Sequence, residues 1–189
     1  SPPRTNRHLY GEVAWYGVLA GSALGFVVIY ITRLGASSAQ LGWMNAGPAM
    51  IALLITLPAG RWLSKQHIGK SMLKMLIAHR AFYALWIFIP FLLPPAAQIN
   101  AFIFLTLAMN LLGTTITIGF NALYAAAVPP EMRGHVAGIR NALLALTLVI
   151  SSLVSGYILD HMPMTEGYAL VFAIGFIGAA MNTFHFIDR

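Results

Sequence analysis

Six long apolar runs constrain this chain more than any other feature of its sequence. A helix needs about 20 apolar residues to cross the hydrocarbon core of a bilayer, and short polar gaps separate runs of that length here. None of the runs alternates polar and apolar residues with the two-residue period of a strand. The sequence therefore predicts an all-α integral membrane protein, a single bundle of six transmembrane helices over residues 1–189. The expected helices span residues 13–31, 41–60, 72–93, 99–128, 136–159 and 168–187.

The composition supports a membrane location. Hydrophobic residues make up 59% of the chain and charged residues 8%, whereas a soluble domain carries about 25% charged residues. The expected surroundings are therefore a lipid bilayer. There is no cysteine, so disulfides, thiolate metal sites and cysteine nucleophiles are excluded. Because no paired carboxylates, metal-ligand spacing or nucleophile constellation is visible either, we expect no enzyme activity, no metal and no cofactor.

The basic residues act as topology signals. A net charge of +6 suggests nucleic acid in a soluble protein, but here the charges lie in short gaps between apolar runs, so we expect no nucleic-acid partner. If neighbouring helices run antiparallel, nine of the eleven Lys and Arg residues fall on one side and only Arg33 on the other. That asymmetry predicts cytoplasmic termini, and we expect a bacterial inner membrane location. The nine are Arg4, Arg7, Arg61, Lys65, Lys70, Lys74, Arg133, Arg140 and Arg189.

The fourth expected helix carries a narrow polar face. Successive residues of a helix are rotated by about 100°, which places six of its polar residues within roughly 80° of one another. Unpartnered hydroxyls and amides are costly in hydrocarbon, so this face lies against protein or lines a water-filled cavity. Hydrogen bonding that serves only helix packing is the alternative. The six residues are Thr106, Asn110, Thr114, Thr117, Asn121 and Tyr124.

A second polar seam lies on the fifth helix, where Arg140, Thr147, Ser151 and Ser155 share one face. This seam faces either the first seam or a neighbouring subunit. The sixth helix has almost no polar residues before Asn182, which is typical of a peripheral scaffold.

Several ionisable side chains lie in or near the spans, and four of them bear on the interior of the bundle. We expect Glu12, near the cytoplasmic mouth, to pair with a basic neighbour or to stay hydrated. Arg80 can snorkel towards the interface or pair inward with a carboxylate or with helix carbonyls. Arg140 is expected to anchor at the lipid headgroups, although attraction of an anion is the alternative. We interpret His79 as a hydrogen-bonded packing residue rather than a ligand of haem or a pigment.

Glycines at four-residue spacing, Gly17, Gly21 and Gly25, line one face of the first helix. Bare backbone there allows another helix to approach closely, which we favour over a role in keeping a central cavity wide.

Two loops resemble those of the major facilitator superfamily. Between the second and third helices, that family has a glycine, an acid four residues later, then a base, a glycine and further bases. Ser64 stands where the family has its aspartate, which helps to latch the cytoplasmic side. The residues that follow the pattern, which the resemblance implies to form a cytoplasmic gating loop, are Gly60, Lys65, Gly69 and Lys70.

The second similar loop is Val128-Pro129-Pro130-Glu131-Met132-Arg133-Gly134, followed by Gly138. It is similar to the cytoplasmic loop between the fourth and fifth helices of the family, so its Glu131, Arg133 and Gly134 are further gating candidates. In physical terms, the prolines end one helix and Glu131 favours the start of the next. Gly134 and Gly138 are expected to let the two helices pack closely.

The resemblance implies one half of a transporter in which two six-helix bundles surround a solute path, lined by the first and fourth helices of each bundle. This chain is more like the amino-terminal half. It begins at Ser1 and ends at Arg189, directly after an apolar run, so a fragment of a longer protein is one expectation. The implied mechanism is alternating access of a small solute, polar and uncharged or amphipathic. The candidate solute contacts are Asn110, Thr114, Thr117 and Asn121, with Tyr16, Asn45 and Ser151 as secondary choices.

Six helices leave one wall of such a path open. The expected partner is a second bundle, which is the missing half, a copy of this chain or other membrane subunits. The alternative function is a non-transporting accessory or structural subunit of a larger membrane complex, because a degenerate latch loop is what lost transport activity would leave.

Overall fold

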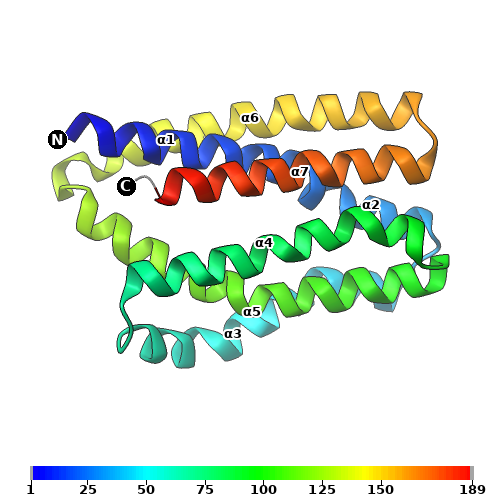
Figure 1. The fold of residues 1–189 in the computed structure, drawn as a ribbon, viewed down its shortest axis with the longest axis horizontal. Coiled ribbons are helices and arrows are strands. Elements are labelled where there is room, and N and C mark those ends of the chain that lie inside the picture. The colour runs from blue at the N-terminus through cyan, green and yellow to red at the C-terminus, as the bar shows by residue number, and fades with distance from the viewer. Residues whose placement is uncertain (1, 188–189) are drawn as a thin grey trace.

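The computed structural model describes the backbone of residues 2–187 and the side chains of residues 8–186. Among the basic residues counted above, the side chains of Arg4 and Arg7 and the whole of Arg189 lie outside the described residues. Figure 1 shows an all-helical chain. Its elements are α1 (Pro2–Leu19), the π-helical turn η1 (Ala20–Leu24), α2 (Gly25–Arg33), α3 (Ser38–Leu63), α4 (Ile68–Leu92), α5 (Pro95–Ala127), the 3-10 turn η2 (Pro130–Met132), α6 (Arg133–His161) and α7 (Met164–Ile187).

The six predicted membrane-length helices are confirmed within the described residues. The first crossing combines α1, η1 and α2, while α3 to α7 each make one crossing. The helices begin before the apolar runs because polar residues can continue a helix beyond the hydrocarbon. At the start of α3, for example, Ser37 and Gln40 form a capping box in which each side chain accepts a hydrogen bond from the other's backbone N–H.

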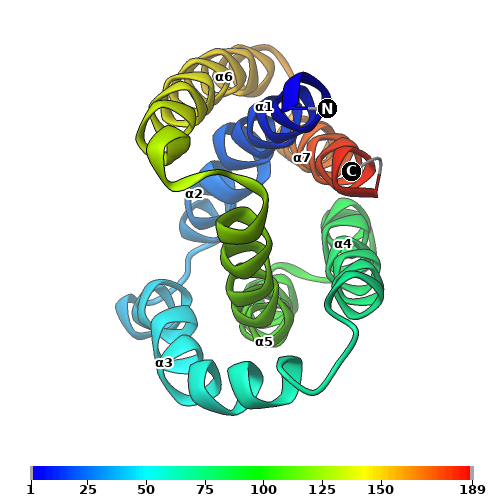
Figure 2. The same cartoon turned by 90° about the vertical axis from the view of Figure 1, so that its left-hand side faces the viewer.

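The helices run lengthwise and antiparallel, so that the start of α1 and the end of α7 lie at the same end of the bundle (Figure 1). Figure 2 looks along the bundle from that end. There α1 lies against both α6 and α7, α4 packs on α7 and α5, and α3 packs on α5. This order brings α1, α4, α5 and α7 around a common interior.

Close glycine contacts hold α1 and η1 against α6. A Cβ added at Gly17 would come within 3.0 Å of the Leu144 carbonyl oxygen, and one at Gly21 would come within 3.0 Å of the Ser151 Cβ. At Gly25 it would meet only the Ala20 carbonyl oxygen of the same crossing. The predicted packing role is therefore confirmed for Gly17 and Gly21 but not for Gly25.

An aromatic core closes the end of the bundle away from the termini. Tyr30 of α2, Trp86 of α4, Phe102 of α5 and Phe172 of α7 are at most 1% exposed, and Tyr30 stacks edge-on against Phe102 with 5.5 Å between ring centroids. Edge-to-face contacts of this kind stabilise a core beyond the area they bury. This core fixes one end of the interior that α1, α4, α5 and α7 surround.

Replacing Tyr30 by phenylalanine should test a buried polar link in this core. The Tyr30 hydroxyl donates a 2.6 Å hydrogen bond to Gln98 Oε1, and Gln98 Nε2 donates to the Leu93 carbonyl at 2.7 Å. Without the hydroxyl, the buried Gln98 oxygen loses its donor, which should cost about 1–2 kcal/mol of unfolding free energy. Denaturant unfolding in detergent measures this loss. Tyr157→Phe is the matched control, since Tyr157 is 66% exposed, and an equal effect in both variants would contradict the prediction.

Candidate functional site

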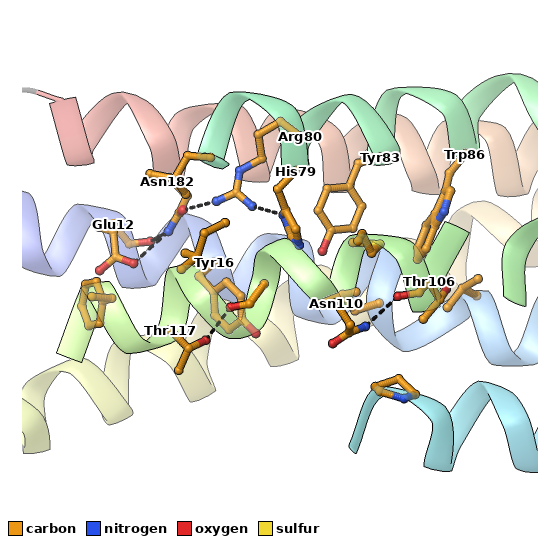
Figure 3. Close-up of a pocket in the computed structure, with 18 of the residues that line it drawn as sticks. Glu12, Tyr16, His79, Arg80, Tyr83, Trp86, Thr106, Asn110, Thr117 and Asn182 are labelled. Atoms are coloured by element: carbon orange, nitrogen blue, oxygen red, sulfur yellow. Dashed lines mark hydrogen bonds between the residues drawn. The ribbon is translucent and has the colours of Figure 1, made fainter. Parts of the chain in front are cut away.

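A cavity of about 550 Å³ lies between the helices of the bundle. Figure 3 shows that it extends from Glu12 on α1 to Trp86 on α4, where the aromatic core begins. Sites that bind small molecules usually measure about 300–1,000 Å³. The cavity is therefore large enough for a small organic solute.

Half of the predicted polar face of α5 contributes to this cavity. Thr106, Asn110 and Thr117 line it, on either side of Gly113. Asn110 Nδ2 donates to the Thr106 carbonyl at 2.8 Å, and the Thr117 hydroxyl donates to the Gly113 carbonyl at 3.0 Å. Both side chains thus use donors within their own helix and keep acceptor oxygens for other partners.

The other three residues of that face are not part of the cavity lining. Thr114 is half-buried and Asn121 is exposed. The Tyr124 hydroxyl donates a hydrogen bond to the Arg133 carbonyl at 3.1 Å, so it joins the end of α5 to the start of α6. The cavity therefore takes only part of the polar seam, and the predicted contacts at Thr114 and Asn121 lie outside its lining.

The three secondary candidates are divided between the cavity and a helix contact. Tyr16 of α1 and Asn45 of α3 line the cavity, and both are exposed. Ser151 of α6 is 8% exposed and packs beside Gly21, outside the cavity lining. Within the α6 seam, Thr147 and Ser151 thus pack against α1 and η1, whereas Arg140 lies over the Tyr124 ring of the α5 face.

Arg80 of α4 points inward and lies at the cavity wall (Figure 3). Its guanidinium donates through Nε to the Thr183 hydroxyl at 2.9 Å and through Nη2 to Asn182 Oδ1 at 2.7 Å. Its Nη1 lies 2.9 Å from His79 Nδ1. The expectation of inward pairing is correct in direction, but these partners are uncharged side chains rather than a carboxylate or helix carbonyls.

Glu12 connects this group to a second arginine. Asn182 Nδ2 donates to Glu12 Oε1 at 3.0 Å, and Arg140 Nη1 donates to Glu12 Oε2 at 2.9 Å and to the Leu9 carbonyl at 2.8 Å. Arg140 also lies over the Phe120 ring, 4.9 Å from its centroid. Glu12 thus has the basic partner that the sequence predicted. The prediction that Arg140 anchors at the lipid headgroups was wrong, because the Glu12 carboxylate on α1 is close enough to hold the guanidinium inside the bundle.

The prediction that the sixth helix is only a peripheral scaffold was also wrong. Asn182 and Thr183 of α7 are 5% and 6% exposed and bind Arg80, and Asn182 lines the cavity. Two consecutive polar residues inside an apolar run were the available signal, because such groups in a membrane helix need partners.

The loop between α5 and α6 is fastened by Arg133. Its Nε donates to the Val128 carbonyl at 3.0 Å and its Nη2 to the Ala125 carbonyl at 2.6 Å, which satisfies the open end of α5. Gly134 and Gly138 have open space where a Cβ would point, so the expected close packing at these two glycines was wrong. Glu131 is exposed.

The loop between α3 and α4 is exposed at its basic residues. Gly60 lies in the last turns of α3, while Gly69 and Lys70 lie in the first turn of α4, and both glycines face open space. Lys65 borders a shallow groove together with Arg61 and Trp62. A gating role for either loop stays a prediction.

Metal ligands are not grouped in the part of the chain with described side chains: no three His, Asp or Glu residues there could hold an ion together. The chemistry of the cavity is that of hydrogen bonds and charge.

Six membrane-length helices around a cavity that carries polar groups define an integral membrane protein of the multi-pass class. The family model of the Major Facilitator Superfamily matches residues 14–189, and the chain belongs to this superfamily of membrane transporters. Its six helices fit one half of such a transporter. No curated protein and no solved structure matches the chain.

Proposed function

We propose that this bundle forms one side of a path along which a small solute crosses the membrane by alternating access. The observation that carries the proposal is that α1 and α5, the first and fourth crossings, both present polar side chains to one cavity. In transporters of this architecture, solutes bind near the middle of the membrane, and one bundle rocks against the other around that site.

The exposure of several cavity residues supports a second bundle as partner. Tyr16, Asn45 and Thr117 line the cavity and are nevertheless exposed, so its wall is open on that side. Polar groups facing hydrocarbon there would be costly, and a second six-helix bundle would cover them. Membership in a transporter family does not favour the accessory-subunit alternative. The bacterial inner membrane and the cytoplasmic position of the termini remain proposals that rest on the basic asymmetry.

Single-cysteine variants should show whether the polar face of α5 is accessible to water. The natural chain has no cysteine, so each variant carries one reactive thiol without further changes. We expect cysteines at Asn110 and Thr117 to react with a membrane-impermeant methanethiosulfonate reagent at least about tenfold faster than cysteines at Leu111 and Ile118, because the reactive thiolate forms in water. The two controls lie one position further along the same helix and outside the cavity lining.

Oriented vesicles extend this measurement to alternating access. The same two cysteines should react when the reagent is added to either face of the membrane. Equal protection of all four positions would contradict the solute path. Reaction from one face only would contradict alternating access but would still show that the cavity contains water. Cysteines at Thr114 and Asn121 establish whether the predicted contacts outside the cavity lining are also accessible to water.

A further inference from the structure

The charges that line the cavity do not cancel. Its ionised side chains are Glu12, Arg80 and Arg140, two cations and one anion. The anion is in direct contact with Arg140, at 2.9 Å. The hydrogen bonds of Arg80 go to uncharged groups, and one of these, Asn182, in turn donates to Glu12. A surplus positive charge at this depth is costly in a membrane helix and is by default a sign of function.

The guanidinium of Arg80 keeps donors for a ligand. An arginine has five N–H donors, one on Nε and two on each terminal nitrogen. Thr183, His79 and Asn182 take one from each of the three nitrogens. These bonds therefore leave one N–H on Nη1 and one on Nη2, the pair that a carboxylate or phosphate accepts in bidentate fashion. The contacts to α7 hold the group in place, so little ordering is needed when a ligand binds.

His79 supplies a further donor at the same place. A guanidinium can only donate, so the His79 Nδ1 that faces Arg80 must accept, and the ring is neutral with its proton on Nε2. This Nε2 lies beside Gly113 of α5, where a Cβ would come within 3.3 Å of it. Gly113 thus lets the ring approach α5 closely, and His79, Gly113, Asn110 and Thr117 all line the cavity. Figure 3 shows the two rings of Tyr83 and Trp86 further along the same wall.

We propose that Arg80 and the Nε2–H of His79 bind the carboxylate or phosphate group of an organic anion, whose apolar part lies towards Tyr83 and Trp86. This inference rests on the proposed solute path and names the class of solute that uses it. It differs from the uncharged solute expected from the α5 face alone, because Arg80 and its surplus charge lie on α4.

Binding of small aromatic probes to the purified full chain in a neutral detergent tests the assignment. Benzoate and phenyl phosphate are the anionic probes, and benzamide is the uncharged analogue of benzoate with nearly the same shape. We expect both anions to quench tryptophan fluorescence saturably and benzamide to bind at least about tenfold more weakly, since it lacks the charge that strengthens hydrogen bonds to a guanidinium.

Variants separate Arg80 from general electrostatics. Arg80→Gln should weaken benzoate binding at least about tenfold, and Arg80→Lys, which keeps the charge but loses the fork of donors, should weaken it less. Arg61→Gln is the matched control, since Arg61 is exposed and borders the separate shallow groove. Circular dichroism and gel filtration verify that each variant is folded. If Arg80→Gln does not fold, the test is made with Arg80→Lys. Benzoate binding by the folded Arg80 variant that equals binding by Arg61→Gln would overturn the inference.

Three other outcomes would also overturn it: no saturable binding of either anion, equal binding of benzamide, or binding of phosphatidylglycerol without either small anion, which would assign the site to a lipid headgroup. Failure of the proposed solute path can be distinguished from failure of the anion site. If anion binding depends on Arg80 but cysteines at positions 110 and 117 are protected, the anion site is supported and the solute path is contradicted. Reactive cysteines without anion binding keep the path but remove the anionic solute.

Discussion

Replacing Glu12 by alanine is expected to lower the free energy of unfolding by about 3–5 kcal/mol, the usual cost of removing one partner of a buried ion pair. The side chains of Glu12 and Arg140 are only 12% and 13% exposed, so the remaining guanidinium cannot recover full hydration. Asn182 loses its side-chain acceptor at 3.0 Å as well. Arg80 and Arg140 are then both positive, without the carboxylate that lies between them. Unfolding in a graded detergent mixture measures the loss.

Two further variants identify the cause of this loss. Asp160→Ala removes an exposed carboxylate at the end of α6 and should change stability by no more than about 0.5 kcal/mol. The double variant of Glu12→Ala with Arg140→Ala should be more stable than the sum of the single effects predicts, by about 1 kcal/mol or more, because no lone charge remains. Strict additivity, or equal effects of Glu12→Ala and Asp160→Ala, would show that the pair does not hold α1 to α6.

The membrane helices were predictable because the bilayer imposes a simple rule. Its thickness sets the length of each apolar run, and the lack of water in its core obliges the backbone to satisfy its own hydrogen bonds. Sequence alone therefore predicts the number of helices. It does not predict the π-helical turn η1 at Ala20–Leu24, because no local sequence pattern indicates one. This turn packs against α6.

The cavity was only partly predictable. Helical periodicity places Thr106, Asn110 and Thr117 on one face, but packing of α5 against α3 and α4 decides which face lines the cavity. That packing places Gly113, which has no side chain to signal it, in the cavity lining and leaves Thr114 outside it. The connection from Arg80 through Asn182 joins residues 102 positions apart, and local patterns carry no information on such pairs.

The same limits apply to Arg140, whose position near the end of an apolar run is typical of a headgroup anchor. The structure pairs it with Glu12, 128 residues earlier, because α1 and α6 approach closely enough for both side chains to meet. That approach depends on the bare backbone of η1. The ion pair and the glycine contact are thus two parts of one interface.

Replacing Gly21 by leucine should therefore disrupt the α1–α6 interface, at a cost of about 3 kcal/mol or more. A side chain there would collide with the carbonyl oxygen of Leu148, which belongs to the α6 backbone and cannot rotate away, and with the Ser151 Cβ at 3.0 Å. The displacement would also break the 3.2 Å hydrogen bond that the Ser152 hydroxyl donates to the Gly21 carbonyl. Detergent unfolding and gel filtration measure the loss of stability and of the folded bundle.

Gly156→Leu on α6 is the matched control, because a Cβ at Gly156 points into open space and the added side chain should change stability by no more than about 1 kcal/mol. If the interface carries the ion pair, combining Gly21→Leu with Glu12→Ala should cost less than the sum of the two, since the first change has already separated the charges. Wild-type stability of Gly21→Leu would mean that α6 moves away at no cost, and α1 would then be positioned by α7 alone.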